Sequence, residues 1–208
     1  ENVHLDSSKP MNEHSAIHLA SSSKPFTATA ILLLHQQGKL NIDDLVTKYL
    51  PTFPYANISI KMLLNHRSGI LNYLNNLENW GWKSPQMISN EDLFNLLVQN
   101  KPILNFPSDT KFSYSNTNYA LLAYIVEKVS GKSFHQYLQN NIFKPLQMLD
   151  TYVFEPKDTL TAIRSYNWRK HIYPFDNLDR TYGDKNIYST VRDMYKWDQA
   201  LYTDKILT

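Results

Sequence analysis

The stretch that most constrains the fold runs from Ser21 to Gly38, where three serines, a lysine and a proline lead directly into an apolar run. Serine hydroxyls can cap a helix, proline is favoured in the first turn of a helix, and glycine readily adopts the left-handed conformation that ends one. These signals predict a helix from about Ser21 to Gln37. Its inward-facing residues, which recur at helical spacing, are predicted to be Phe26, Ala30, Leu33, Leu34 and Gln37.

Ser21 and Lys24 lie three residues apart at the start of this helix, so their side chains share one face. A serine hydroxyl is a weak nucleophile until a neighbouring base removes its proton, and an amine held beside it in a partly desolvated site can do so. A chain of this composition contains about one Ser-x-x-Lys by accident. Ser108 and Lys111 form a second copy, which follows a proline and has no apolar helix behind it, so it is interpreted as a loop.

Composition excludes several classes of function. The 208 residues carry a net charge of +2 and no block of Lys or Arg, which argues against nucleic acid as a partner. The absence of cysteine excludes disulfides, a thiol nucleophile and Cys-based zinc sites. No apolar run reaches the roughly 20 residues of a membrane-spanning helix. No metal or organic cofactor is implied, and 42% hydrophobic residues allow a substantial core.

Three histidines are candidates for chemistry, and each has a simpler interpretation. His14 and His18 lie in an alternating stretch that predicts a short strand feeding the Ser21 helix, where surface or edge positions are favoured over metal ligation. His66 follows a short helix predicted over residues 60–65 with Ser59 as its cap. No Asp is spaced to orient His66 as a general base, so an imidazole that braces a turn is favoured.

Further helices follow from the same capping and spacing signals. They are predicted over residues 91–99, 119–130, 134–141 and 190–202. Their predicted caps are Asn90, Gly131, Ser133 and Ser189, and the last helix is expected to turn Met194, Trp197 and Leu201 inward. Residues 72–85 are rich in Asn, Trp and Tyr without periodicity, which predicts a long surface loop or the wall of a site.

Five blocks of sequence occur in a specific order: residues 17–28 with Ser21-x-x-Lys24, 38–51, 63–69 with Leu-Leu-Asn-His66, 112–122 with Tyr114-Ser-Asn116, and 188–193. Together they resemble the serine beta-lactamase-related family, which includes class C beta-lactamases, D-Ala-D-Ala carboxypeptidases and related esterases and aminopeptidases. The resemblance runs from about Ser15 to the end of the chain. Each block is modest alone, but five in the right order are specific.

The resemblance implies roles for four residues. In the family the first-motif serine is acylated and its lysine helps to take the proton. The second-motif tyrosine relays a proton toward the leaving group, and its asparagine orients substrate and lysine. At the matching positions of this chain these residues are Ser21, Lys24, Tyr114 and Asn116. Tyr-x-Asn also starts at Tyr55 and Tyr73, but only the copy at Tyr114 leads into the family's helix block, so the other two are interpreted as loop residues.

The implied fold is α+β and beta-lactamase/transpeptidase-like, a helical domain beside an α/β domain with an antiparallel sheet and the site between them. This chain is expected to be a single partial catalytic domain, cut at both ends. Residues 1–20 are expected to be a strand and loop remnant, residues 21–182 a mainly helical region with the site, and residues 183–208 a C-terminal helix returning toward the missing sheet. Ser21, Lys24 and Tyr114 are expected to converge at one surface.

Two departures from the family pattern stand out. The third family motif, Lys-Thr-Gly or His-x-Gly on a strand that supplies one of two oxyanion-hole donors, has no convincing match, since Arg67-Ser68-Gly69 fits it only loosely and belongs to the Leu-Leu-x-His block. Residues 183–186 read Gly-Asp-Lys-Asn where the family often has adjacent glycines, which is expected to reshape a loop near the site.

The resemblance implies a serine hydrolase that forms an acyl-serine at Ser21 on beta-lactam or D-Ala-type peptide substrates and then releases it to water. The class A deacylation motif Glu-x-x-Leu-Asn is absent, which favours a class C-like arrangement. The alternatives are an esterase acting on small esters, and a penicillin-binding sensor or inactive binding module without turnover. A Ser-His-Asp hydrolase is disfavoured because the five glycines form no Gly-x-Ser-x-Gly. A small-molecule or peptide substrate and an extracytoplasmic location are implied, and the oligomeric state is left open.

Overall fold

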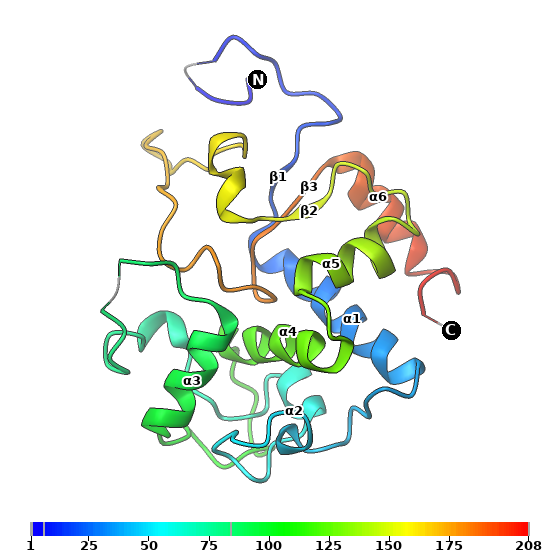
Figure 1. Cartoon of the computed structure of the whole chain (residues 1–208). Helices are drawn as coiled ribbons and strands as arrows, with labels where there is room; N and C mark the ends of the chain where they lie inside the picture. The colour runs from blue at the N-terminus through cyan, green and yellow to red at the C-terminus, as the bar shows by residue number, and fades with distance from the viewer. Residues whose placement is uncertain (1, 6, 84, 208) are drawn as a thin grey trace.

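The computed structural model describes residues 2–5, 7–83 and 85–207, in which helices pack below a small antiparallel sheet (Figure 1). The helices are α1 (Lys24–Gln36), α2 (Ile60–Leu64), α3 (Asn90–Asn100), α4 (Asn116–Ser130), α5 (Phe134–Leu138) and α6 (Val191–Ala200). The strands β1 (Ile17–His18), β2 (Tyr152–Val153) and β3 (Ile187–Ser189) pair in the order β1-β3-β2. This confirms the predicted fold class. The predictions for residues 1–20, 72–85 and 183–208 also cover Glu1, Asp6, Ser84 and Thr208, which lie outside the described residues.

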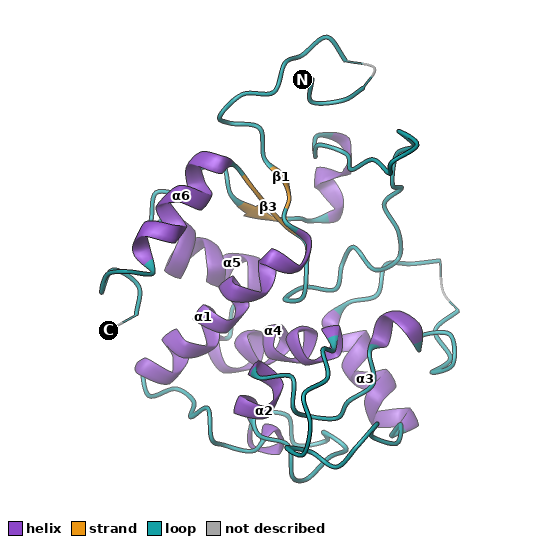
Figure 2. Cartoon of the chain, turned by 180° about the vertical axis from the view of Figure 1, so that it is seen from behind, coloured by secondary structure: helices purple, strands orange, loops and turns teal. Residues whose placement is uncertain are grey.

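The sheet attaches the chain just before α1 to the chain just before α6, as Figure 2 shows from behind. Ile17 pairs with Ser189 and His18 with Tyr188. The predicted strand is confirmed but is shorter than the alternating stretch, because residues 20–23 already form a 3-10 helix (η1, Ala20–Ser23). The hydroxyl of Ser23 accepts a hydrogen bond from the backbone N–H of Ile187 at 3.1 Å instead of capping α1.

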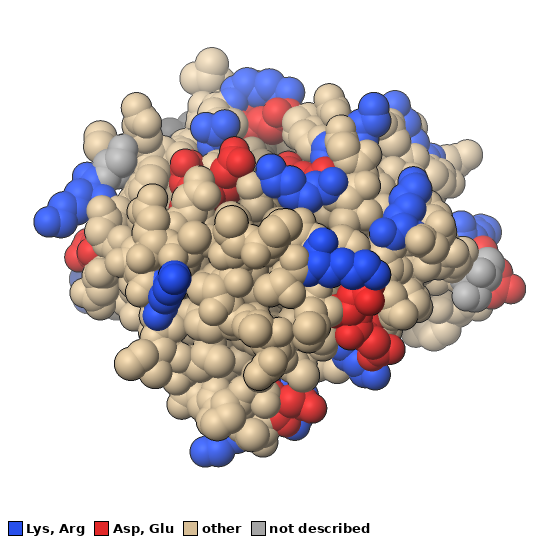
Figure 3. Space-filling view, turned by 60° about the horizontal axis from the view of Figure 1, so that its bottom comes forward, with Lys and Arg blue, Asp and Glu red and all other residues tan. Residues whose placement is uncertain are grey.

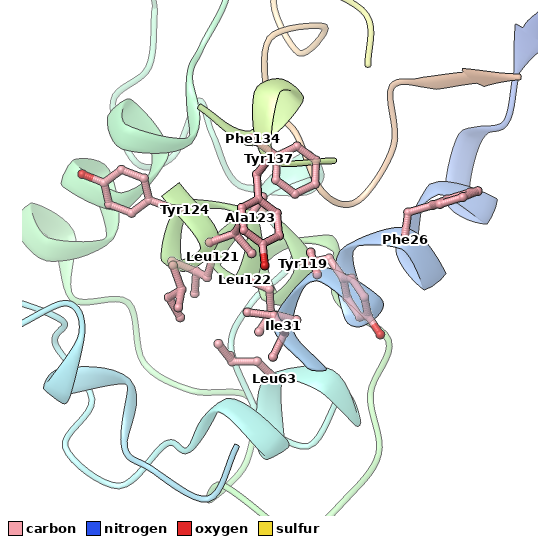
Figure 4. Close-up of a cluster of buried hydrophobic side chains, with 14 of the residues drawn as sticks. Phe26, Ile31, Leu63, Tyr119, Leu121, Leu122, Ala123, Tyr124, Phe134 and Tyr137 are labelled. Atoms are coloured by element: carbon pink, nitrogen blue, oxygen red, sulfur yellow. The ribbon is translucent and has the colours of Figure 1, made fainter. Parts of the chain in front are cut away.

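The core lies where α1 crosses α4, with α2, α3 and α5 packed around α4. Residues 116–126 of α4 are all buried. Figure 4 shows side chains of α1, α2, α4 and α5 converging there, among them Phe26, Ile31, Leu63, Leu122 and Phe134. Each fully buried apolar side chain of this size contributes about 1.5–3 kcal/mol. This packing holds α1 in one position relative to α4.

The predicted inward face of α1 is confirmed at its four apolar positions but is wrong at Gln37. That residue is exposed because α1 ends at Gln36 and Gln37 is its C-cap. Two predicted caps are displaced by one residue. Ser89, through a reciprocal capping box with Asp92, caps α3 in place of Asn90. Thr190 caps α6 in place of Ser189, which belongs to β3.

The surface carries small, separate groups of acidic and basic side chains on the face shown in Figure 3, many of them beside an opposite charge. The ion pairs of the described surface include Lys48–Asp44 at 2.8 Å and Lys61–Asp43 at 3.2 Å. The described helices all fall short of the length and apolarity needed to cross a bilayer.

Gly183 allows the segment before β3 to pass directly over α4. Its φ is +100°, and a Cβ there would lie 2.3 Å from the carbonyl oxygen of Tyr119 and 2.6 Å from the Cβ of Ala123. Gly131 also has a positive φ, +67°, but a Cβ on it would meet nothing within 4 Å. We therefore expect Gly131→Ala to lower the free energy of unfolding by about 1 kcal/mol, and Gly183→Ala to lower it by about 3 kcal/mol or more. Urea unfolding monitored by circular dichroism measures both losses, and equal losses would contradict the close approach.

Candidate active site

The first turn before α1 and the segment leading into α4 bring three reactive side chains together. Lys24 Nζ lies 3.1 Å from Ser21 Oγ, and the Tyr114 hydroxyl donates to the same oxygen at 2.8 Å. Lys24 Nζ also lies 4.8 Å from the centre of the Tyr114 ring. Ser21 is exposed and Tyr114 is 46% exposed, so a substrate can reach the shared oxygen. The predicted convergence of these three side chains at one surface is confirmed.

Helical geometry explains the contact between Ser21 and Lys24. Ser21 lies in η1 and Lys24 begins α1, so their three-residue spacing places both side chains on one face. Lys24 is only 6% exposed, whereas Ser21 faces solvent. Lys24 forms no salt bridge within the described residues, and its second hydrogen bond goes to the backbone carbonyl of Asp184 at 2.7 Å. The amine is therefore directed at Ser21 by a neutral acceptor.

The segment of Gly183 and Asp184 lies against the start of α1 and accepts hydrogen bonds from its side chains. The Thr27 hydroxyl donates to the Gly183 carbonyl at 2.7 Å, and the Tyr73 hydroxyl donates to Asp184 Oδ2 at 2.9 Å. Asp184 is 1% exposed, and its Oδ1 has no hydrogen-bond partner among the described residues. Burial raises the pKa of the Asp184 carboxyl, and burial followed by the charge of Asp184 raises the pKa of the Tyr73 phenol well above its usual value.

Sequence reasoning missed the role of Tyr73. The interpretation as a loop residue is wrong, because Tyr73 begins a 3-10 helix (Tyr73–Asn75) and is fully buried beneath the site. The sequence contains one related signal, which is that residues 183–186, including Asp184, read Gly-Asp-Lys-Asn where the family often has adjacent glycines. Tyr55, by contrast, donates to the Pro102 carbonyl at 2.6 Å, and the second Ser-x-x-Lys at Ser108 lies in irregular chain, as predicted.

Asn116 lies at the start of α4, two residues beyond Tyr114, and is 8% exposed. Within the described part of the chain its side chain forms no hydrogen bond, and the two hydrogen bonds of Lys24 go to Ser21 and Asp184. A buried carboxamide has two donors and an acceptor to satisfy. The predicted contact of Asn116 with Lys24 is thus not seen as a hydrogen bond.

His66 braces the turn after α2, as the sequence predicted. Its Nδ1 accepts the backbone N–H of Ser115 at 3.2 Å, and its ring lies 4.6 Å from that of Tyr114. Burial, followed by the charge of Lys24, lowers the pKa of His66 to about 4. Ser68, in the loose match to the third motif, is buried and donates to Asn118 Oδ1, so that match is part of the same turn.

Two hollows of the described surface do not coincide with these side chains. They have volumes of about 640 and 700 Å³, and none of the four predicted site residues lines either one. The candidate site lies at the hydrogen-bonded side chains of Ser21, Lys24 and Tyr114, because a reaction depends on the contacts between reactive groups and not on the volume of a hollow. Among the described residues, no cluster of three or more His, Asp or Glu could hold a metal ion.

A helical body, a small antiparallel sheet and a Ser-Lys-Tyr cluster between them define a beta-lactamase/transpeptidase-like protein. The family model described as Beta-lactamase matches residues 3–208, and the chain belongs to this family. The resemblance drawn from the five sequence blocks is thereby confirmed.

Individual relatives agree with this assignment. Penicillin-binding protein 4* of Bacillus subtilis (strain 168) is 34% identical over 220 residues, covering 96% of this chain and 48% of the relative. The solved penicillin binding protein from Bacillus halodurans has a TM-score of 0.85 and 27% identity, covering 100% of this chain and 65% of that one. D-amino acid amidase from Ochrobactrum anthropi SV3, complexed with L-phenylalanine amide, has a TM-score of 0.77 and 26% identity, covering 96% and 59%. The chain spans about half the length of the curated relatives it matches.

Proposed function

We propose that this chain carries the acylation machinery of a serine hydrolase, with Ser21 as nucleophile. The observation that carries the proposal is the double hydrogen bond at Ser21 Oγ, to the Lys24 amine at 3.1 Å and the Tyr114 hydroxyl at 2.8 Å. A hydroxyl that touches both a base and a proton relay has what nucleophilic catalysis needs.

The proposed reaction has two steps. In the first, Ser21 Oγ loses its proton to Lys24 and bonds to the substrate's carbonyl carbon. The carbon–nitrogen bond then breaks, Tyr114 gives its proton to the leaving nitrogen, and the proton taken up by Lys24 returns to Tyr114. In the second step water adds to the ester, the carbon–oxygen bond to Ser21 breaks, and the serine hydroxyl and a carboxylic acid are restored. Asn116, whose carboxamide has no hydrogen-bond partner among the described residues, is proposed to bind the substrate's amide.

The oxyanion hole limits which substrates react readily. The backbone N–H of Ser21, at the start of a helical segment where such groups lack helical partners, is the first proposed donor. The family's second donor comes from the third-motif strand, which has no match in this sequence. Each such donor contributes about 3–4 kcal/mol of transition-state stabilisation. A strained beta-lactam, which needs less of this stabilisation than an unactivated peptide, is therefore the proposed substrate for testing Ser21.

The known relatives support two kinds of substrate for the proposed reaction. Penicillin-binding relatives support a beta-lactam or a D-Ala-type peptide, and the D-amino acid amidase supports a D-amino acid amide as a second candidate with the same scissile bond type. Both alternatives, the esterase and the penicillin-binding sensor, would form the same acyl-serine. The esterase would differ in the leaving group of its substrate, and the sensor would not hydrolyse the acyl-serine. The extracytoplasmic location stays a prediction.

Incubation with a fluorescent penicillin, followed by mass spectrometry of the intact protein over time, tests the proposal. We expect one adduct, mapped to the peptide that contains Ser21. An adduct that decays with release of hydrolysed drug indicates a beta-lactamase, and an adduct that persists indicates a penicillin-binding sensor. Absence of any adduct together with hydrolysis of small esters would replace the proposal with the esterase, and absence of both would refute it.

Tyr114→Phe is expected to slow acylation by about 100-fold or more, because it removes only the hydroxyl that relays the proton. The ring remains beside His66, so the thermal midpoint is expected to change little. Stopped-flow fluorescence with the labelled penicillin measures the rate. Tyr55→Phe is the matched control, since that hydroxyl bonds to Pro102 in a loop, and it is expected to leave the rate within twofold of wild type. Equal rates for both variants would remove Tyr114 from the mechanism.

A further inference from the structure

His66 lies directly behind Tyr114 in a constrained conformation. It is 8% exposed and has a φ of +55°, which is uncommon for a residue other than glycine. Its ring centre lies 4.6 Å from that of Tyr114, 5.1 Å from that of Tyr119 and 5.8 Å from that of Phe112. Aromatic pairs at such separations attract each other. The imidazole therefore supports the phenol ring on the side away from solvent.

His66 also anchors the backbone on both sides of Tyr114. The N–H of Ser113 donates to the His66 carbonyl at 2.8 Å, and the N–H of Ser115 donates to His66 Nδ1 at 3.2 Å. The residues before and after the phenol are thus bonded to one residue, and the phenol itself rests on the ring of that residue. A displacement of about 1 Å at a reacting group can cost 100-fold in rate.

A buried polar chain fixes the state of the imidazole. Ser68 Oγ donates to Asn118 Oδ1 at 2.6 Å, and Asn118 Nδ2 lies 3.3 Å from His66 Nδ1. Since an amide nitrogen can only donate, Nδ1 accepts from Asn118 as well as from Ser115. This assigns the ring proton to Nε2 and requires a neutral imidazole, because an imidazolium has no acceptor.

We propose that His66 is a positioning residue of the Ser21 site, whose neutral imidazole holds the Tyr114 hydroxyl against Ser21 and whose protonation releases it. The inference rests on the proposed function, since it assigns a partner to the proton relay. The described contacts of His66 include its ring contact with Tyr114 and no hydrogen bond to Ser21, so it is proposed to act through Tyr114.

The electrostatic surroundings of His66 agree with this role. The titratable groups that face it are Lys24 of α1, Tyr114, and Tyr119 of α4, while the adjacent Arg67 is paired with Asp109 at 2.6 Å. Burial and the Lys24 charge hold the pKa near 4, against about 6.5 for an unfolded histidine. Between these values the unfolded chain binds more protons than the folded one. The stability contributed by neutral His66 is therefore complete above pH 6.5 and is lost as the pH falls toward 4.

Two variants separate the parts of this role. His66→Asn keeps a side-chain acceptor near Nδ1, tolerates a positive φ and does not titrate, whereas His66→Phe keeps an aromatic ring and has no acceptor. We expect acylation by the fluorescent penicillin to slow by about 100-fold in His66→Phe and by less than about 10-fold in His66→Asn. His171→Phe, at an exposed position far along the chain, is the matched control and is expected to match wild type. Circular dichroism establishes that each variant is folded.

A second readout does not depend on activity. In ¹H–¹⁵N spectra, the Ser115 amide resonance of the wild type is expected to titrate with a midpoint near pH 4, and that of His66→Asn is expected not to titrate over this range. Wild-type acylation rates in folded His66→Phe, or a Ser115 resonance that ignores His66 protonation, would overturn the inference. A wild-type protein that forms no acyl-serine would instead refute the proposed function, while the Ser115 resonance would still report on the His66 bond.

Discussion

Ser21→Ala is expected to abolish acylation, lowering its rate by about 10⁴-fold or more, because the variant lacks the only oxygen that bonds to the substrate. Ser21 is exposed and its main structural contacts are the hydrogen bonds to Lys24 and Tyr114, so the fold is expected to persist. Intact-protein mass spectrometry after exposure to the fluorescent penicillin measures the adduct, and stopped-flow fluorescence measures the rate.

The second Ser-x-x-Lys provides the matched control for Ser21. Ser108→Ala removes a serine from the same tetrapeptide pattern, but Ser108 lies in irregular chain with no hydrogen bond to Lys111 among the described contacts. It is expected to acylate at the wild-type rate. Persistence of the adduct in Ser21→Ala, or its loss in Ser108→Ala, would show that the nucleophile had been assigned to the wrong copy.

Lys24→Met is expected to have the second largest effect, a loss of about 10³-fold in acylation rate. Methionine retains the length of the buried stem but cannot accept the proton from Ser21 Oγ, which lies 3.1 Å from the amine in the wild type. The substitution also removes the donor to the Asp184 carbonyl at 2.7 Å, so a modest fall in thermal midpoint is expected beside a large fall in rate.

The control for Lys24 is Lys111→Met, which removes an exposed lysine of the loop copy and is expected to leave the rate unchanged. Rates are compared by stopped flow and folding by thermal denaturation. A folded Lys24→Met protein that acylates as fast as wild type would exclude Lys24 as the base. Tyr114, the other described hydrogen-bond partner of Ser21 Oγ, would then be the candidate base.

Local signals predicted the parts of the site that depend on neighbouring residues. The three-residue spacing of Ser21 and Lys24 places their side chains in contact once a helix begins there. Gly131 ends α4 in the left-handed conformation, as a glycine after a helical pattern predicts. The caps of α3 and α6 were displaced by one residue because Asn90 and Ser189 have tertiary partners. Asn90 donates to the carbonyls of Ala120 and Tyr182, and Ser189 pairs in β3.

Contacts between distant residues could not be predicted from local pattern. Tyr114 lies 93 residues from Ser21, and only the resemblance to the family placed them together. Tyr73 and Asp184 are 111 residues apart, and neither belongs to a family block that was recognised, so their buried pair beneath Lys24 appeared only in the structure. The same holds for the bond between His66 and Ser115, since a histidine after a short helix does not indicate what its ring will contact.

A crystal structure of the protein with a boronic acid that mimics the acylation intermediate tests the central claim most directly. The account predicts a covalent bond between boron and Ser21 Oγ, with Lys24 Nζ and the Tyr114 hydroxyl both within hydrogen-bonding distance of that oxygen, as they are at 3.1 and 2.8 Å in the free protein. Boron bound to another residue, or to Ser21 with either partner turned away, would contradict it.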